Sequence, residues 1–175
     1  HVFASATQFG LTQALGMNSE LPAAVFRAYG IGDRSACVAL FDENCPAYFA
    51  PNEREDYVRF LDTNPESYVV CFQAERLVGA HGVKPVDVTS STLDWIMLSP
   101  SVQGHGLGTI IMARVMEELN RLGHTTLHIG ASHKSAPFFA KFGAVGLSTV
   151  PNGWGPGMHR VEMQLGQVTD HGVHA

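Results

Sequence analysis

Three glycines at alternate positions, Gly104, Gly106 and Gly108, stand directly before a stretch whose apolar residues have helical spacing. The first four backbone N–H groups of a helix have no partner within it, and the aligned peptide dipoles add partial positive charge there. Glycines lack the Cβ atoms that would keep an anion away from these N–H groups. This segment therefore predicts a main-chain binding site for a phosphate or pyrophosphate.

The spacing of these glycines excludes two common phosphate loops. A P-loop needs a Gly-Lys pair, which the chain lacks, and a dinucleotide fingerprint needs Gly-x-Gly-x-x-Gly, whereas this segment reads Gly-x-Gly-x-Gly. The segment does fit Gln-x-x-Gly-x-Gly from Gln103, and so resembles the acyl-CoA pyrophosphate loop of the GNAT superfamily of N-acyltransferases. The alternative is a glycine-rich turn that only allows a helix to pack on a sheet.

A second motif follows at the separation usual in that family. The predicted helix at 135–142 ends in Phe-Phe-Ala-Lys-Phe before Gly143, which resembles the family's Phe-Tyr-Glu-Lys-x-Gly-Phe helix along the pantetheine arm. Segments 41–61 and 153–163 resemble those of a small-molecule subgroup of the family. The resemblance covers about residues 24–165.

The resemblance implies an N-acetyltransferase that moves an acetyl group directly from acetyl-CoA to the primary amine of a small molecule in a ternary complex. A catalytically impaired acyl-CoA-binding module and a protein or peptide N-acetyltransferase are the alternatives. The residues implied to bind acetyl-CoA are Ile96, Met97 and Leu98 through their backbone groups, and Gln103, Gly104, His105, Gly106, Leu107, Gly108, Thr109, Ser132 and Phe139.

Acetyl transfer also requires a base, because an amine with a pKa of about 10.4 is protonated in neutral water. The family often places this base on the strand before the loop, most often at the position of Thr92. Asp94 is the only carboxylate of the predicted strand 92–98, where a buried charge is costly. Strand alternation predicts that Thr92, Asp94 and Ile96 share one face. Asp94 is therefore the predicted base, with an anchor for the substrate ammonium or a structural charge as alternatives.

The usual proton donor to the leaving CoA thiolate is the Tyr of the second motif, and this chain carries Phe139 at that position. A phenyl ring cannot donate a proton. Ser135 lies one helical turn earlier on the same face, and a thiol of pKa about 8.5 can also leave as thiolate. Ser135 or solvent is therefore predicted as the donor. Ser132 corresponds to a frequent Asn of the family that contacts pantetheine or the thiol.

Further residues are predicted around the acceptor. Tyr48 and Trp154 are expected to form walls of its pocket. Glu53 and Glu55 could also reach it, although carboxylates at a helix start often only complement the dipole. His105 replaces a common Arg of the loop and could modulate phosphate affinity, or could simply be exposed.

Composition excludes several other classes of function. The net charge of −5 and the lack of a basic run argue against nucleic acid. The nine histidines lack metal-ligand spacing, so no metal is expected, and the Gly-x-Ser-x-Gly elbow of a serine hydrolase is absent. Cys37, Cys45 and Cys71 suggest reduced thiols in a cytoplasmic protein, and no apolar run is long enough to span a membrane. The expected partners are acetyl-CoA and a small amine, with a homodimer as a candidate assembly.

The pattern of apolar residues and breakers predicts an α/β protein of order βααβββαβαββ. The resemblance makes this a GNAT fold: a mixed, mostly antiparallel sheet with splayed central parallel strands. One domain is expected over residues 23–166, with an N-terminal extension at 1–22 and a C-terminal tail at 167–175. Asp33 and Asn52 are predicted helix N-caps. The predicted strands are 23–29, 67–73, 77–83, 91–98, 125–129, 144–150 and 158–165, and the predicted helices are 33–45, 53–61, 110–122 and 135–142.

Overall fold

Seven strands form a single mixed sheet in the computed structural model, which describes residues 23–166. The predicted extension and tail lie outside the described residues. The strands are β1 (Ala24–Ala28), β2 (Tyr68–Gln73), β3 (Arg76–Pro85), β4 (Ser90–Leu98), β5 (Thr126–Ser132), β6 (Val145–Gly155) and β7 (Met158–Gly166). The helices are α2 (Arg34–Asn44), α3 (Glu53–Asp62), α4 (Leu107–Arg121) and α5 (Ala136–Ala140), with 3-10 turns η1 (Ile31–Asp33) and η2 (Pro100–Val102). The predicted order of strands and α-helices is confirmed.

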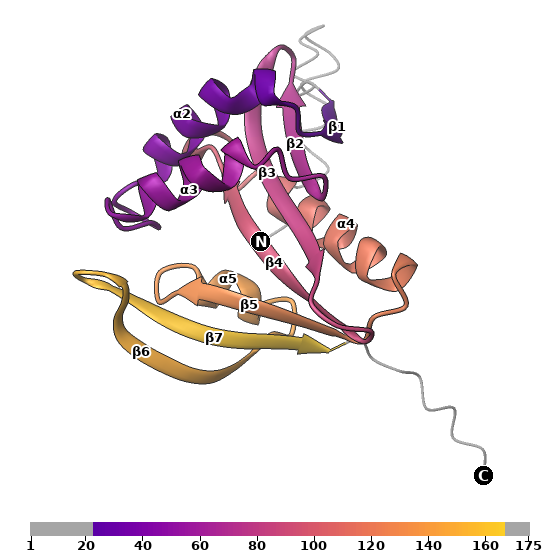
Figure 1. Ribbon diagram of the computed structural model, residues 1–175, viewed down its shortest axis with the longest axis vertical. Coiled ribbons are helices and arrows are strands. Elements are labelled where there is room, and N and C mark those ends of the chain that lie inside the picture. Colours follow the sequence, from indigo (N-terminus) through magenta and orange to yellow (C-terminus); the bar gives the residue numbers. More distant parts are fainter. Residues whose placement is uncertain (1–22, 167–175) are drawn as a thin grey trace, which may run out of the picture.

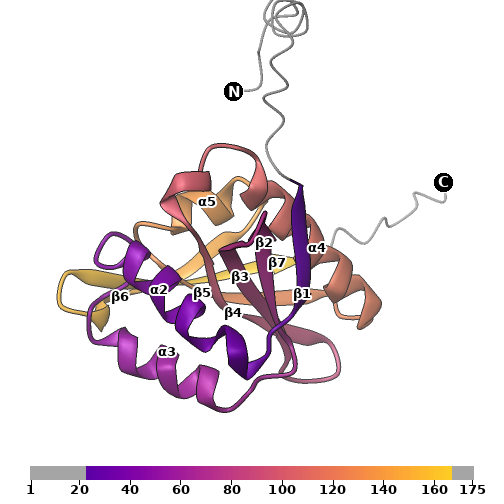
Figure 2. The ribbon, with the colours of Figure 1, turned by 90° about the horizontal axis from the view of Figure 1, so that it is seen from above.

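The helices cover both faces of the sheet, whose strand order is β1-β2-β3-β4-β5-β7-β6. Figure 2 shows α2 and α3 on one face, and α4 and α5 on the other. Each face has its own apolar cluster. The α2/α3 cluster includes Leu40, Tyr57 and Leu61, and the α4/α5 cluster includes Ile111 and Phe139. Within the described residues, no helix is long and apolar enough to cross a membrane.

Helix α4 forms because its apolar residues recur every three or four positions and so share one face. It begins three residues earlier than predicted, immediately after Gly106, which has a left-handed φ of 83°. Gly123, with φ of 71°, follows its C-terminal end. The buried side chains of α4 are Leu107, Ile111, Met112, Val115 and Leu119.

The two central parallel strands separate soon after they begin. β4 pairs with β5 only from Ser90 to Thr92, opposite residues 126–128. Beyond this point β4 continues along β3, whereas β5 continues along β7 to Ser132. Figure 1 shows the two strands diverging. The predicted splay is thus confirmed, and it opens a gap in the middle of the sheet.

A β-bulge interrupts β4 beside this gap. Asp94 lies opposite Gly82 and Met97 opposite Ala80, so that β4 has one more residue here than β3. Trp95 takes a positive φ of 39°, which is rare outside glycine. An extra residue reverses the alternation of side chains between the two faces.

The bulge makes one prediction wrong, because Ile96 does not share a face with Thr92 and Asp94. Ile96 packs against the α4/α5 cluster, whereas Trp95 packs against the α2/α3 cluster. Asp94 also lies on the α2/α3 face, since a Cβ atom built on Gly82 would lie 3.5 Å from the Asp94 Cβ and 3.1 Å from the ring of Tyr68.

Neither predicted N-cap side chain accepts a hydrogen bond from the backbone of its own helix. Asp33 precedes α2, but its carboxylate accepts the Gly30 N–H at 2.9 Å and pairs with Arg27 at 2.7 Å. Asn52 precedes α3, and its amide instead donates to the backbone carbonyl of Trp154 at 2.8 Å. Asp33 thus caps the preceding 3-10 turn η1, whereas Asn52 satisfies a tertiary partner that local spacing does not reveal.

The β6–β7 connection is tighter than predicted. The predicted strands 144–150 and 158–165 leave residues 151–157 as a loop. In the structure this segment is mostly strand, because β6 extends to Gly155 and β7 begins at Met158. Asn152 supports the turn by accepting the Gly157 N–H at 2.7 Å. The tip of the hairpin lies beside the α2–α3 connection (Figure 2).

Candidate functional site

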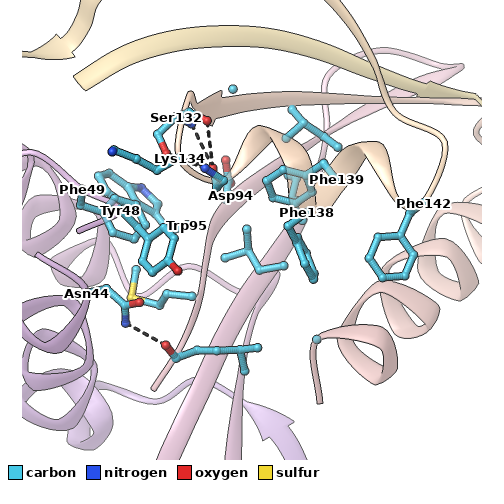
Figure 3. A pocket seen from close by; sticks show the side chains of 18 of the residues that line it. Asn44, Tyr48, Phe49, Asp94, Trp95, Ser132, Lys134, Phe138, Phe139 and Phe142 are labelled. Carbon is cyan, nitrogen blue, oxygen red and sulfur yellow. Dashed lines mark hydrogen bonds between the residues drawn. The ribbon is translucent and has the colours of Figure 1, made fainter. Parts of the chain in front are cut away.

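A pocket of about 890 Å³ occupies the gap between the separating strands. We call it the central pocket; β4 lines it from Thr92 to Leu98, and β5 lines it from His128 to Gly130. Figure 3 shows Tyr48, Phe49 and Trp95 grouped at one side, and Phe138, Phe139 and Phe142 at the other. We call the first group the aromatic end. The glycine turn, residues 103–106, adds Gln103, Gly104 and Gly106 to the lining.

The three glycines of the predicted phosphate loop are needed for two different reasons. Gly104 and Gly106 have left-handed φ values of 81° and 83°, and a Cβ atom on either would meet no atom within 4 Å. Gly108 instead allows close packing, because a Cβ atom there would lie 2.9 Å from the ring of Phe138. The open space above the first two is where an anion could approach the main chain.

Unpaired backbone donors surround this space. Within residues 23–166, the six N–H groups from Gly104 to Thr109 have no hydrogen-bond acceptor. Gln103 and Ile110, on either side, donate their N–H groups to Pro100 and Gly106. Six unpaired donors at the start of a fifteen-residue helix form a site where an anion is stabilised by hydrogen bonds and by the helix dipole.

Most of the predicted cofactor residues line the central pocket, with two exceptions. His105 is exposed and Leu107 is buried in the α4/α5 cluster, so each could contribute only its backbone N–H. The predicted residues that line the pocket are Ile96, Met97, Leu98, Gln103, Gly104, Gly106, Gly108, Thr109, Ser132 and Phe139.

The backbone N–H and C=O groups of β4 point alternately toward β3 and toward the gap. The Ser99 N–H donates to Val78 of β3 at 2.8 Å, and alternation directs the backbone of Met97 toward β3 as well. Ile96 and Leu98 therefore present their backbone groups toward the gap. The Leu98 carbonyl accepts the Asn44 amide at 2.9 Å. Of the three predicted strand residues, Ile96 and Leu98 have N–H groups in a position to bind a ligand.

Asp94 lines the central pocket as predicted. Its carboxylate is half-buried and has no hydrogen-bond donor among the described residues. Burial raises the pKa of this carboxyl group, and the positive charge of Lys84 opposes the shift. An unpaired carboxylate in a pocket can bind a cation or accept a proton.

Of the two glutamates that the sequence suggested near the acceptor, one lines the central pocket and the other is exposed. Glu53 is 5% exposed and lines the central pocket, and its carboxylate accepts the Ala50 N–H at 2.6 Å. Burial raises its pKa to about 7, against the effect of the Ala50 hydrogen bond, and the negative charge of Asp56 raises it further. Glu55 is exposed and lies 3.9 Å from Arg59, away from the pocket.

Ser132 and Ser135 form a reciprocal turn between β5 and α5. Each backbone N–H donates to the hydroxyl of the other residue at 3.1 Å, and the two hydroxyl oxygens are also 3.1 Å apart. Both side chains line the central pocket. The Ser135 hydroxyl thus stabilises this turn. Phe139, at the position of the usual tyrosine, is 3% exposed and packs against Phe138.

The aromatic end of the pocket is closed by contacts between distant segments. The Trp95 ring stacks on Phe49 with centroids 6.0 Å apart. Trp154 donates its indole N–H to the Ala131 carbonyl at 2.9 Å and accepts the Asn52 amide through its own carbonyl. The β6–β7 hairpin is thereby tied to both β5 and the start of α3. Tyr48 and Trp154, the predicted walls, both line the pocket.

Several lining residues were not predicted from the sequence. One of them is Asn44, a polar residue in the last turn of α2 that is 2% exposed and donates its amide to the Leu40 and Leu98 carbonyls. The others come from segments whose mutual position the sequence does not reveal. The unpredicted lining residues include Asn44, Phe49, Trp95, Lys134, Phe138, Phe142, Arg160 and Glu162.

Comparison with known families and structures gives a consistent result. The family model described as "Acetyltransferase (GNAT) family" matches residues 37–144, more than half of the chain. No curated protein matches the sequence.

Solved structures share the fold at low sequence identity. The yncA protein of Salmonella typhimurium, with its cofactor acetyl-CoA, is 15% identical with a TM-score of 0.63, over 82% of this chain and 94% of that one. An aminoglycoside 6'-N-acetyltransferase complexed with coenzyme A is 15% identical with a TM-score of 0.63, over 81% and 96%. The ribosomal-protein-S18-alanine N-acetyltransferase of Escherichia coli is 18% identical with a TM-score of 0.66, over 82% and 94%.

Proposed function

The chain belongs to the acetyltransferase (GNAT) family, and on that premise we propose that it transfers the acetyl group of acetyl-CoA to a primary amine of a small molecule in a ternary complex. The observation that carries this proposal is the row of six unpaired N–H groups from Gly104 to Thr109 beside the gap between β4 and β5. A pyrophosphate needs such donors, and an extended pantetheine arm needs the unpaired strand edge that continues from them.

The cofactor would follow the central pocket from the glycine turn toward the aromatic end. Its pyrophosphate would bind the N–H groups of residues 104–109, and its pantetheine carbonyls would accept the free backbone N–H groups of Ile96 and Leu98. Phe138 and Phe139 would contact the arm from the α5 side. Solved structures of this fold that contain acetyl-CoA or coenzyme A support this assignment.

A small acceptor is favoured over a peptide by the closure of the aromatic end. The Asn52–Trp154 hydrogen bond joins the β6–β7 hairpin to the start of α3. This contact would narrow the opening through which a peptide could enter the pocket. The aromatic rings of Tyr48, Phe49 and Trp95 suit an ammonium group, because the faces of aromatic rings attract cations. The alternative, a protein acetyltransferase, is represented among similar folds by the Escherichia coli enzyme.

Two residues are proposed to act on the reacting groups. Asp94 is the carboxylate of β4 that would meet the amine, as base or as ammonium anchor. Ser135 is proposed to pass a proton to the CoA thiolate, directly or together with water. Its hydroxyl already forms a hydrogen bond with that of Ser132. In this role the same hydroxyl would both stabilise the turn and supply the proton.

An amine panel with a free-thiol readout tests the proposal. The full chain is mixed with acetyl-CoA and with small amines, polyamines, aminoglycosides, free lysine and short peptides. We expect thiol release with one class of small amine and little with peptides. Release with peptides alone would overturn the small-molecule assignment. Tight CoA binding, measured by calorimetry, without thiol release from any acceptor would instead identify a binding module without catalysis.

A further inference from the structure

Glu53 is the most deeply buried carboxylate of the central pocket, and the function proposed above assigns it no role. It lines the pocket from the first turn of α3. One carboxylate oxygen, Oε2, accepts the Ala50 N–H at 2.6 Å, and Oε1 has no donor among the described residues. This hydrogen bond fixes the carboxylate and leaves its second oxygen free to accept a proton.

From this geometry we infer that Glu53 is the base that removes a proton from the acceptor amine, and that Asp94 anchors the substrate by its charge. The inference rests on the proposed N-acetyltransferase function. Both carboxylates line the same pocket from different elements, and the proposed division requires that one amine contact both. Glu53 would be the catalytic residue and Asp94 a binding residue.

The burial of the two carboxylates supports this division of roles. A general base works best when its pKa lies near the working pH, and burial brings the pKa of Glu53 to about 7. Asp94 is half-buried, and Lys84 opposes the rise of its pKa. Where two carboxyl groups have surroundings that set their pKa values apart, one can handle the proton while the other stays ionised.

Other ionisable groups lie around Glu53. Burial is the main cause of the raised pKa of Glu53, and the charge of Asp56 on the same helix adds to it. Burial also raises the pKa of the Cys45 thiol at the end of α2, and the charges of Asp42 and Glu53 add to that rise. No cation pairs with Glu53 at salt-bridge distance within the described part of the chain. The remaining titratable or charged residues that share its pocket are Tyr48, Asp94, His128, Lys134, Lys141, Arg160 and Glu162.

In the proposed step, the substrate ammonium gives one proton to the Glu53 carboxylate. The neutral nitrogen then attacks the thioester carbonyl carbon, so that a C–N bond forms, and collapse of the tetrahedral adduct breaks the C–S bond. The second proton lost by the nitrogen goes to the CoA thiolate through Ser135 or water. Glu53 finally releases its proton to solvent, and no other reactant is required.

The test compares Glu53→Gln with Glu55→Gln, using the amine found active in the panel. Glutamine can still accept the Ala50 N–H but cannot take a proton, so the turn is kept. Glu55 is exposed in the same helical turn, and its replacement controls for a lost charge. We expect kcat of Glu53→Gln to fall by roughly 10²- to 10⁴-fold, with CoA affinity unchanged, and Glu55→Gln to match the parent chain.

The pH profile separates a catalytic role from a structural one. The parent chain should lose kcat as the pH falls through about 7, the pKa of Glu53, and Glu53→Gln should lack this limb. Asp94→Asn should keep the limb and raise only the KM for the amine. If Glu53→Gln keeps the limb, or if Asp94→Asn abolishes it, the inference is overturned while the acetyltransferase function stands. If no acceptor releases thiol, the proposed function fails, and this inference fails with it.

Discussion

Tyr68 donates its hydroxyl to the backbone carbonyl of Trp95 at 2.7 Å, across the face of β3 that lies between them. Trp95 is the bulge residue of β4 with a positive φ, a conformation that persists only when its surroundings hold it. Tyr68 is fully buried, and its hydroxyl also bonds that of Tyr57 at 2.9 Å. The bulge that shapes one wall of the central pocket is therefore fixed from β2.

Removing this hydroxyl should disturb the pocket more than the rest of the fold. Tyr68→Phe leaves a buried carbonyl without its donor, which costs about 1–3 kcal/mol of unfolding free energy. We expect kcat to fall several-fold with little change in CoA affinity, because Tyr68 packs in the α2/α3 cluster and is not among the residues that line the central pocket. Chemical denaturation and steady-state kinetics measure the two effects.

Tyr57→Phe is the matched control for this prediction. It removes the neighbouring hydroxyl, which bonds Tyr68 and not Trp95, and so should lower stability without lowering kcat. Equal loss of kcat in the two variants would mean that the aromatic cluster as a whole matters, and not the hydrogen bond to the bulge.

A side chain at Gly106 should prevent CoA binding. Gly106→Val places a branched Cβ in the open space above the unpaired N–H groups and forces a β-branched residue into a φ of 83°. We expect calorimetry to show at least a tenfold loss of CoA affinity. Gly123→Val is the control, since Gly123 has a φ of 71° with the same open surroundings but does not line the pocket. Unchanged CoA affinity in the Gly106 variant would refute the loop assignment.

Restoring the usual tyrosine should be tolerated at position 139. Phe139→Tyr adds a hydroxyl to a residue that lines the central pocket, and a phenol there can donate a proton to the thiolate. We expect turnover to stay equal or rise, most visibly below the thiol pKa of about 8.5. Loss of turnover with intact CoA binding would show that the site requires the apolar contact of the ring with Phe138.

The burial of Glu53 should also appear in the stability of the protein. Its folded-state pKa of about 7 lies above the ordinary 4.5, so the folded protein binds more protons than the unfolded chain between these values. Its contribution to stability is therefore fully present below pH 4.5 and is lost as the pH rises through about 7.

Glu53→Gln removes this titration. Denaturation at a series of pH values should show the parent chain losing unfolding free energy relative to Glu53→Gln between pH 4.5 and 7. The same measurement on Glu55→Gln should give no such difference, because Glu55 is exposed. A constant difference between the parent chain and Glu53→Gln across this range would contradict the burial of a titrating carboxylate.

Local spacing was enough to predict the glycine turn and the helix that follows it. Gly104 and Gly106 lie next to the helix whose N–H groups they leave open, so both features follow from neighbours in sequence, whereas the binding of acetyl-CoA there stays a prediction. The order of elements could be predicted for the same reason, since apolar periodicity and breakers act over a few residues.

The wall of the central pocket formed by β4, α3 and the β6–β7 hairpin, where we propose that the acceptor binds, was decided by tertiary contacts. The bulge at Trp95 depends on pairing with β3 and moved Ile96 to the other face. Asn52 binds Trp154, about a hundred positions away in the chain, and so does not cap its helix. Glu53 and Glu55 are two residues apart in one helix and look equivalent in sequence. Only the packing of α3 against the central pocket buries one and exposes the other, because desolvation depends on what surrounds a carboxylate in space and not on its neighbours along the chain.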